Sequence, residues 1–226
     1  MPLDPGRIQA ICFDVDGTLS DTDDQYLQRL ARWLAPLHVF YPRRSPDALA
    51  HWLLHRLEAP GSLWMHTSDH LRLDGPLARL SDLLDWLNYR GQRANFLLVP
   101  GVSELLAQLH GRYPLGVVSA RRQRATLDFL ASFELSDYFQ VVITGQTTRY
   151  TKPHPDPLLF AAVQLGVAPQ ALLMVGDTVS DIQAGRAAGA QTVGVLCGFG
   201  DQAELLQAGA DLILESTADL AEALVL

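Results

Sequence analysis

Short apolar runs rich in β-branched residues alternate with longer helical patterns along most of this 226-residue chain. The strand-like runs are "IQAICF", "LGVVS", "QVVIT", "ALLMVG", "TVGVL" and "DLIL". The helical patterns between them are "VSELLAQLHGRY", "RQRATLDFLASF", "PDPLLFAAVQLG", "DIQAGRAAGA" and "QAELLQAGA". Continuous apolar strands separated by helices are typical of a parallel sheet covered on both faces. The pattern therefore predicts an α/β fold with a doubly wound, Rossmann-like core, whose ligand site lies at the carboxyl ends of the strands.

One long stretch interrupts this alternation. Residues 22–99 contain no good strand and read as amphipathic helices, such as "DQYLQRLARWLAPL", "SPDALAHWLLHRLE" and "LARLSDLLDWLNYR". All four tryptophans fall in this stretch, most of them as expected core of a helical bundle. We predict a catalytic core formed by residues 1–20 and 100–226 and an all-helical cap domain at 21–99. Short linkers near 20–22 and 99–101 would let the cap close over a ligand as a hinge.

The charge balance argues against some partners. The formal net charge is −8, and nucleic acid needs basic stripes, so we expect no nucleic-acid partner. Residues 20–98 hold nine arginines and nine acids, so the negative charge belongs to the core. An anionic substrate would thus meet its positive partners in the cap or at a few placed core residues. The sequence does not indicate an oligomeric state.

The expected location is the cytoplasm. No apolar run reaches membrane-spanning length, and the start "MPLDPGR" lacks the apolar region of a signal peptide, so no membrane partner is expected. Cys12 and Cys197 both lie in apolar runs and do not resemble a disulfide framework.

Two carboxylates follow the first apolar run, in "AICFDVDGT". A pair such as Asp14 and Asp16 is by itself weak evidence, because many such matches are caps and turns. Here the pair comes directly after a strand expected to be buried, where carboxylates are costly without a cation or hydrogen bonds. The position therefore favours a metal-dependent site.

Three further signals stand at the ends of predicted strands. Ser119, in "VVSAR", is either an ordinary helix N-cap or part of an anion-binding site at a helix start. Lys152, in "TKPHPD", is the only lysine of the chain; a loop lysine is normally solvated, but an ammonium group can also contact a phosphate and a carboxylate together. His154 beside it is expected to be exposed.

The last signal is "MVGDTVSD". Asp177 comes at the end of a strand, and Asp181 falls in the first turn of the next helix, where the helix dipole also favours an acid. Because a doubly wound sheet brings its strand ends to one edge, the four signals together predict a single site.

These motifs, with "PGVSELLAQL", "KPHPDPLLF", "GDTVSDIQAGRAAGA" and the tail "VGVLCGFGDQAELLQAGADLIL", resemble the haloacid dehalogenase-like superfamily, phosphatase branch with a helical cap. The tail is most similar to phosphoglycolate phosphatase-type members. The resemblance implies that Asp14 attacks phosphorus to form an aspartyl-phosphate and that Asp16 moves protons for the leaving alcohol and the attacking water.

The resemblance also implies the binding groups. Mg²⁺ would be held by Asp14, the Asp16 carbonyl and Asp177. Asp181 would act on a water at the metal or orient its neighbours. The phosphoryl oxygens would be bound by Ser119, the Ala120 N–H and Lys152.

The resemblance narrows the reaction without naming the substrate. Dehalogenases of this superfamily lack the second acid, so Asp16 disfavours dehalogenation. Phosphoglycolate phosphatases usually carry Asn then Lys where Ala120 and Arg121 stand, and Ser-Ala also resembles β-phosphoglucomutases. We therefore predict a Mg²⁺-dependent phosphomonoester hydrolase acting on a small phosphorylated metabolite, of phosphoglycolate type or a sugar phosphate. A phosphomutase and a catalytically silent binding protein are the alternatives.

Contacts to the substrate's leaving group are expected from the cap. The candidates are Arg43, Arg56, Trp64 and Arg72, each of which is also readily explained as an ordinary cap residue.

Overall fold

The computed structural model describes residues 2–21 and 96–224, which all fall in one compact unit of the chain. The predicted cap lies almost wholly outside the described residues, so its boundaries and helical character stay predictions. Among the helices that are described, none is both long and apolar enough to cross a membrane. The cytoplasmic location remains a prediction.

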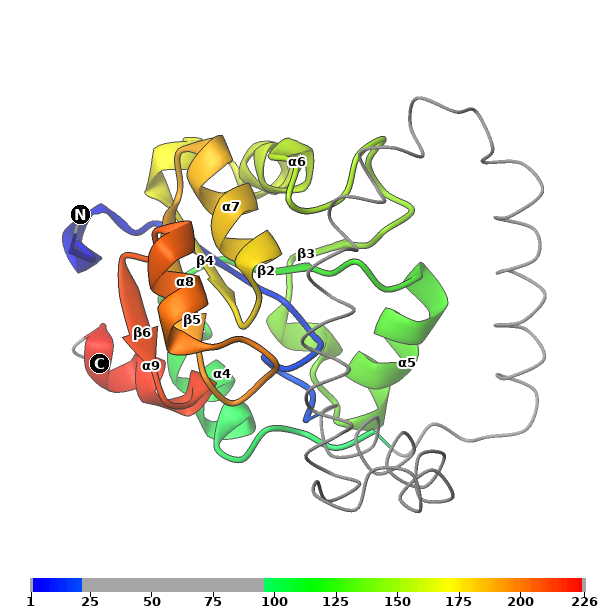
Figure 1. Cartoon of the computed structure of the whole chain (residues 1–226). Helices are drawn as coiled ribbons and strands as arrows, with labels where there is room; N and C mark the ends of the chain where they lie inside the picture. Colours follow the sequence, from blue (N-terminus) through cyan, green and yellow to red (C-terminus); the bar gives the residue numbers. More distant parts are fainter. Residues whose placement is uncertain (1, 22–95, 225–226) are drawn as a thin grey trace, which may run out of the picture. The chain divides into compact units, whose positions relative to one another are not determined.

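A six-stranded, all-parallel sheet forms the centre of the described unit (Figure 1). Its spatial order is β3-β2-β1-β4-β5-β6. The strands are β1 (Ala10–Phe13), β2 (Leu115–Val118), β3 (Val141–Ile143), β4 (Leu172–Gly176), β5 (Gln191–Val195) and β6 (Leu212–Leu214). Each of the six predicted strand runs overlaps one of these strands, with β5 beginning one residue before its predicted run, which confirms the α/β fold.

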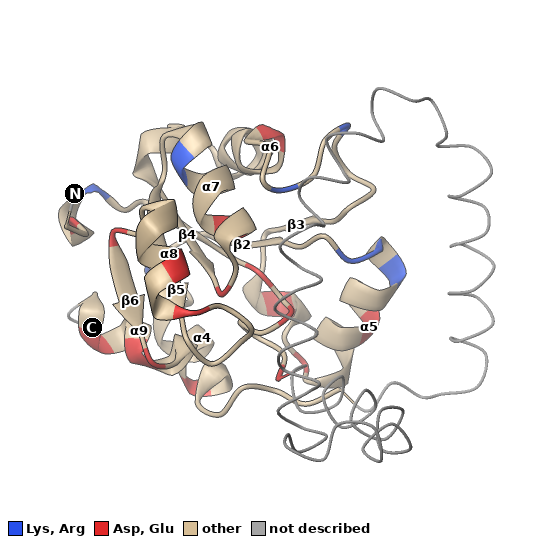
Figure 2. Ribbon diagram, in the orientation of Figure 1, with Lys and Arg blue, Asp and Glu red and all other residues tan. Residues whose placement is uncertain are grey.

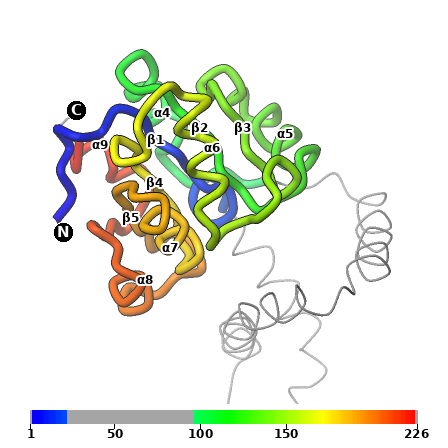
Figure 3. Tube along the Cα trace, turned by 90° about the horizontal axis from the view of Figure 1, so that it is seen from above, coloured from blue at the N-terminus to red at the C-terminus, as the bar shows by residue number. Residues whose placement is uncertain are grey.

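Helices cover both faces of the sheet (Figures 1 and 3). The α-helices are α4 (Val102–Leu109), α5 (Gln123–Ser132), α6 (Asp156–Leu165), α7 (Val179–Ala188), α8 (Gln202–Ala208) and α9 (Leu220–Ala223). Short 3-10 helices are η1 (Pro5–Arg7), η3 (Ser136–Tyr138), η4 (Pro169–Ala171) and η5 (Thr217–Asp219). Helices α6 and α7 pack on one face, with α8 against α7, whereas α4, α5 and α9 contribute to the core of the other face.

The central strand shows why both faces are apolar. Along β1, Ile11 and Phe13 belong to the core that includes α4 and α5, and Ala10 and Cys12 belong to the core that includes α6 and α7. Since successive strand residues point to opposite faces, a strand buried on both sides needs an uninterrupted apolar run. All four residues of β1 are buried.

The strand order places a switch point next to β1. From β1 the chain moves outward through β2 to β3 on one side, whereas β4, β5 and β6 follow on the other. In sheets of this kind ligands bind where the direction of winding reverses, outside the carboxyl ends of the strands. The expected site is therefore between the ends of β1 and β4.

Candidate active site

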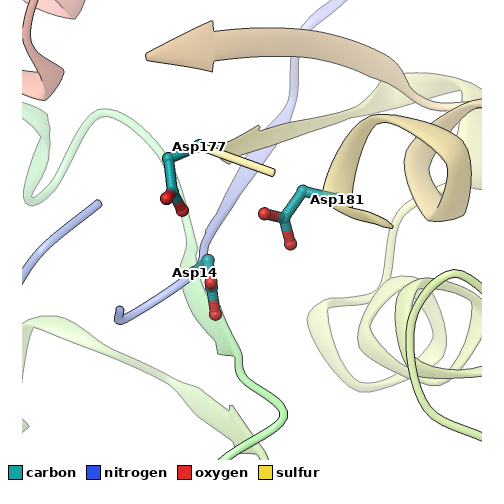
Figure 4. A group of neighbouring side chains, drawn as sticks. All are labelled: Asp14, Asp177 and Asp181. Atoms are coloured by element: carbon teal, nitrogen blue, oxygen red, sulfur yellow. The ribbon is translucent and has the colours of Figure 1, made fainter. Parts of the chain in front are cut away.

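Three buried carboxylates meet at this switch point (Figure 4). Asp14 directly follows β1, Asp177 directly follows β4, and Asp181 lies in the first turn of α7. One carboxylate oxygen from each lies within 4.8 Å of the others. The structure thus brings Asp14 together with two acids that lie more than 160 residues later in the sequence.

A tight turn after β1 places Asp14 against Asp177. Gly17 has a φ of +71°, and the hydroxyl of Thr18 donates to Asp177 Oδ1 at 3.2 Å. The Thr18 carbonyl in turn accepts a 2.7 Å hydrogen bond from the Thr217 hydroxyl. The "DGT" that follows Val15 is therefore a structural link between the two strand ends.

The loop after β5 completes the surroundings of Asp177. The Phe199 N–H donates to Asp177 Oδ2 at 2.9 Å. A Cβ at Gly198 would lie 2.2 Å from the same oxygen, so only glycine fits there. No role for "CGFG" was predicted from the sequence, although two glycines close after a predicted strand could have indicated a close backbone approach there.

Asp181 is engaged by protein donors at both oxygens. Its Oδ2 accepts from the Thr178 N–H at 3.0 Å and from the Thr178 hydroxyl at 2.6 Å, as part of a capping box at the start of α7. Its Oδ1 accepts from Lys152 Nζ at 2.5 Å. These bonds fix Asp181 as the group that orients Lys152 beside the other acids.

Lys152 also pairs with Asp14. Its Nζ lies 2.8 Å from Asp14 Oδ1, and both side chains are buried. Burial alone would lower the pKa of Lys152, but attraction to Asp14 and Asp181 outweighs it and raises the pKa above its ordinary value. The lysine is therefore charged in the site, and its burial excludes the alternative of an ordinary solvated loop lysine.

The environment of Asp14 disfavours its charge when no cation is present. Burial raises the pKa of Asp14 to about 7; attraction to Lys152 opposes this rise, whereas repulsion from Asp181 adds to it. Although Lys152 is close, Asp14 Oδ1 has no aligned hydrogen bond among the described residues. A buried carboxylate oxygen with one ion-pair partner still has lone pairs that suit a cation.

The donor set fits a hard divalent cation. All three clustered groups are carboxylates, and oxygen ligands are those preferred by Mg²⁺ and similar ions. Three acids face one lysine, so the cluster retains negative charge that a cation would neutralise. The described residues as a whole carry seventeen acids and eight basic residues. Figure 2 shows both kinds spread over the ribbon.

The predicted anion-binding loop lies between β2 and α5. Ser119 is buried and follows β2, and its hydroxyl accepts from the Arg121 N–H at 3.2 Å, whereas Ala120 is exposed. The N-cap of α5 is Arg122, so the interpretation of Ser119 as an ordinary helix N-cap is wrong. Three residues separate Ser119 from the first turn of the helix because the chain forms a separate turn there.

Asp16 is held by a residue outside the predicted site. Arg121 Nε donates to Asp16 Oδ2 at 2.5 Å, and Arg121 Nη2 donates to Asp16 Oδ1. From the sequence, Arg121 was recognised only as a departure from a family pattern. Its position directly after Ser119 and Ala120, at the same sheet edge as Asp16, could have indicated that it belongs to the site.

Other predicted residues have simple outcomes. His154 is exposed as expected and pairs with Asp156 at 3.1 Å. Cys12 and Cys197 are free thiols. The cap candidates Arg43, Arg56, Trp64 and Arg72 lie outside the described residues.

Comparisons with known proteins match the chain over nearly its whole length. Residues 11–195 match the family model described as haloacid dehalogenase-like hydrolase. The phosphoglycolate phosphatase of Escherichia coli (strain K12) is 41% identical over 239 residues, covering 96% of this chain and 92% of that protein. The phosphoglycolate phosphatase of Chromobacterium violaceum is 31% identical, covering 95% of each chain.

A solved structure agrees with the fold. The crystal structure of a hydrolase from Pseudomonas syringae has a TM-score of 0.72 and 26% identity, covering 96% of this chain and 98% of that one. The order of the strands, the buried acids at the β1/β4 switch point and the near full-length relatives agree with one another. The chain belongs to the haloacid dehalogenase-like hydrolase family, on its phosphatase branch.

Proposed function

We propose that this phosphatase hydrolyses the phosphomonoester of a small metabolite, with Mg²⁺ held by Asp14, Asp177 and the main-chain carbonyl of Asp16. The cluster of three buried carboxylates around a buried lysine carries the proposal. When bound, the ion neutralises charge on the cluster and on the transferring phosphoryl group.

Asp14 is the proposed nucleophile. One of its oxygens forms a bond to phosphorus while the bond from phosphorus to the substrate alcohol breaks, which leaves an aspartyl-phosphate. A water molecule then attacks that phosphorus, and the Asp14 carboxylate leaves with inorganic phosphate as product. The lack of an aligned hydrogen bond at Asp14 Oδ1 among the described residues supports this role.

Asp16 is the proposed proton carrier. It gives a proton to the departing alcohol and takes one from the attacking water, so that it returns to its starting state after each turnover. Two observations support the assignment: Asp16 follows Asp14 by two residues, and its side chain is about one-third exposed, so that a substrate can reach it.

Lys152, the Ser119 hydroxyl and the Ala120 N–H are the proposed phosphoryl-binding groups. The two bonds from Lys152 to acids set the direction of its ammonium group, and preset donors of this kind stabilise developing charge without reorganisation. Asp181 orients Lys152 from the α7 side.

The names of the relatives support the proposed substrate class. Proteins of similar length that are named phosphoglycolate phosphatases support a small phosphomonoester of phosphoglycolate type, with a sugar phosphate as the other candidate. We further propose that the inserted segment at 21–99 is a cap that closes over the substrate and selects the leaving group. Arg43, Arg56, Trp64 and Arg72 are its proposed substrate contacts.

The test is phosphate release from a panel of phosphorylated metabolites, measured with Mg²⁺ and with EDTA. The panel contains phosphoglycolate, pyrophosphate, sugar phosphates and nucleotides. We expect Mg²⁺-dependent release from one small phosphomonoester well above the others. Asp14→Asn should lower turnover by at least about 10³-fold because no nucleophile remains. Asp137→Asn, a matched change at an exposed acid, should leave it unchanged.

Two results would overturn the proposal. Near-wild-type turnover by folded Asp14→Asn would reject the nucleophile. The absence of release from every compound would favour the phosphomutase, which the Ser119–Ala120 sequence also resembles. Conversion of β-glucose 1-phosphate in the presence of a bisphosphate activator would then identify the mutase, and its failure would leave the silent binding protein.

A further inference from the structure

Arg121 forms a bidentate ion pair with Asp16, donating a hydrogen bond to each carboxylate oxygen. Its Nε and Nη2 each donate to a different oxygen, the paired geometry that suits a guanidinium group and that lysine cannot reproduce. Arg121 comes from the loop after β2, and Asp16 from the turn after β1. The pair thus joins the ends of two neighbouring strands.

The surroundings make this more than a surface ion pair. The guanidinium carbon lies 5.8 Å from the ring centroid of Phe96 and 5.6 Å from that of Phe129. The Arg121 side chain is only 15% exposed, and its buried Nη1 has no hydrogen-bond partner among the described residues. Aromatic faces attract a guanidinium cation and exclude water from it. The solvent therefore screens the Arg121–Asp16 ion pair less than it would an exposed pair.

The backbone of Arg121 is anchored as well. Its N–H donates to the Ser119 hydroxyl at 3.2 Å, and its carbonyl accepts from the Gly145 N–H at 2.9 Å. A Cβ at Gly145 would lie 2.5 Å from the Ala120 carbonyl oxygen, so the loop after β2 lies close against the loop after β3. The base from which Arg121 reaches Asp16 is therefore fixed in the loop proposed to bind phosphate.

We propose that Arg121 is a positioning residue for proton transfer, which sets the place of the Asp16 carboxylate relative to the phosphoryl-binding loop. This inference rests on the role of Asp16 in the proposed function. A carboxyl group has about four acceptor sites, so pairing with arginine leaves on each oxygen a lone pair that can hold the proton given to the leaving alcohol and later take one from the attacking water. Arg121 itself touches neither the phosphoryl group nor the alcohol in this role.

The test compares leaving groups. In the phosphorylation step an alkoxide needs a proton to leave, whereas p-nitrophenolate leaves readily without one, so a misplaced acid slows that step only for the alkyl substrate. The quantity compared is kcat/KM, because hydrolysis of the aspartyl-phosphate is common to both substrates and follows the step that kcat/KM reports. Arg121→Met removes both donors and keeps an apolar chain beside the two rings. We expect it to lower kcat/KM for the preferred alkyl phosphomonoester by about 10- to 100-fold. Its kcat/KM for p-nitrophenyl phosphate should change by less than about 3-fold.

Four further variants complete the design. Arg124→Met, at an 82% exposed arginine in the first turn of α5, should behave as wild type with both substrates. Asp16→Asn should show the same selective loss as Arg121→Met, and the double variant should lose no more than Asp16→Asn alone. The kcat/KM of Arg121→Lys for the alkyl substrate should lie between the values of wild type and Arg121→Met. Arg121→Lys replaces Arg121→Met in the comparison if Arg121→Met fails to fold.

The outcomes separate the inference from the function it rests on. Equal losses of kcat/KM with both substrates in the Arg121 variants would overturn the inference, as would additive losses in the double variant. If Asp16→Asn itself lowered kcat/KM equally for both substrates, the role of Asp16 as proton donor to the leaving alcohol would fail, and the inference with it.

Discussion

Gly17 shows at the scale of one residue how tightly the acid cluster is enclosed. Its φ of +71° is unfavourable for any side chain, and a Cβ there would lie 2.2 Å from Asp177 Oδ2. Gly111 offers a matched comparison, since its φ is +84° but a Cβ would meet nothing within 4 Å. Alanine substitutions at the two positions therefore distinguish the cost of backbone strain from the effect of displacing Asp177.

We therefore expect Gly17→Ala and Gly111→Ala each to cost about 1 kcal/mol of folding stability from the positive φ. Gly17→Ala should in addition lose most Mg²⁺-dependent phosphate release because it moves Asp177. Thermal unfolding and phosphate release, measured on both variants, check this. Full activity in Gly17→Ala would contradict the tight contact.

At the scale of one element, the start of α7 both caps a helix and orients the site. The Thr178 side chain accepts from the Asp181 N–H, and the Asp181 carboxylate returns the bond to the Thr178 N–H. A second capping box, formed by Ser216 and Asp219, begins η5 and involves no acid of the cluster. Among the described helices, the same local motif thus begins α7 inside the site and η5 outside it.

Thr178→Ala should cost about 1 kcal/mol of stability, or a fall of about 2–4 °C in Tm. It should also lower kcat several-fold, since Asp181 loses a hydroxyl donor and holds Lys152 less firmly. Ser216→Ala should show a similar fall in Tm with kcat unchanged. Equal kcat values for the two variants would argue against the link from α7 to Lys152.

The burial of Cys12 in strand β1 predicts that its thiol reacts slowly with alkylating reagents in the folded protein. Burial raises the pKa of this thiol to about 12, and burial also raises the pKa of Cys197. Only the thiolate reacts with alkylating reagents, and at pH 9 a thiol of pKa 12 is roughly a thousandth ionised. Iodoacetamide at pH 9 should therefore modify Cys12 only in unfolded protein, as peptide mass mapping with and without urea would show. Rapid labelling of Cys12 in the folded protein would contradict its burial in the sheet.

At the scale of the whole molecule, stability is expected to depend on the divalent cation. Three buried carboxylates beside one lysine repel one another in the metal-free protein, and a cation that binds only the folded state stabilises it by mass action. At 100 times its Kd, Mg²⁺ should add about 2.7 kcal/mol, or about 5–10 °C in Tm.

Thermal unfolding with MgCl₂, and with NaCl at the same ionic strength, measures this effect. Asp177→Asn should abolish the specific rise in Tm, because the cluster loses one of its charged oxygens. A rise of the same size in that variant would show that Mg²⁺ acts elsewhere on the protein.

The sequence by itself determined the parallel sheet and most of the cluster. The continuous apolar run of β1 predicted a strand buried on both faces, and the positions of Asp14, Lys152 and Asp177 after strand-like runs predicted their meeting. These inferences hold because strand burial and strand ends are local properties of the chain, and parallel topology brings the carboxyl ends to one edge.

Only the tertiary structure decided which side chains pair across that edge. Arg121 pairs with Asp16 across two loops, and the Phe199 N–H donates to Asp177 from a third. The turn at Ser119, where its hydroxyl accepts from the Arg121 N–H, is a further example. How closely these segments approach depends on the packing of the whole core. Side-chain partners from distant segments leave no periodic signal in a single sequence. Hydrogen-bond geometry, unlike strand burial, is settled only when those segments are in place.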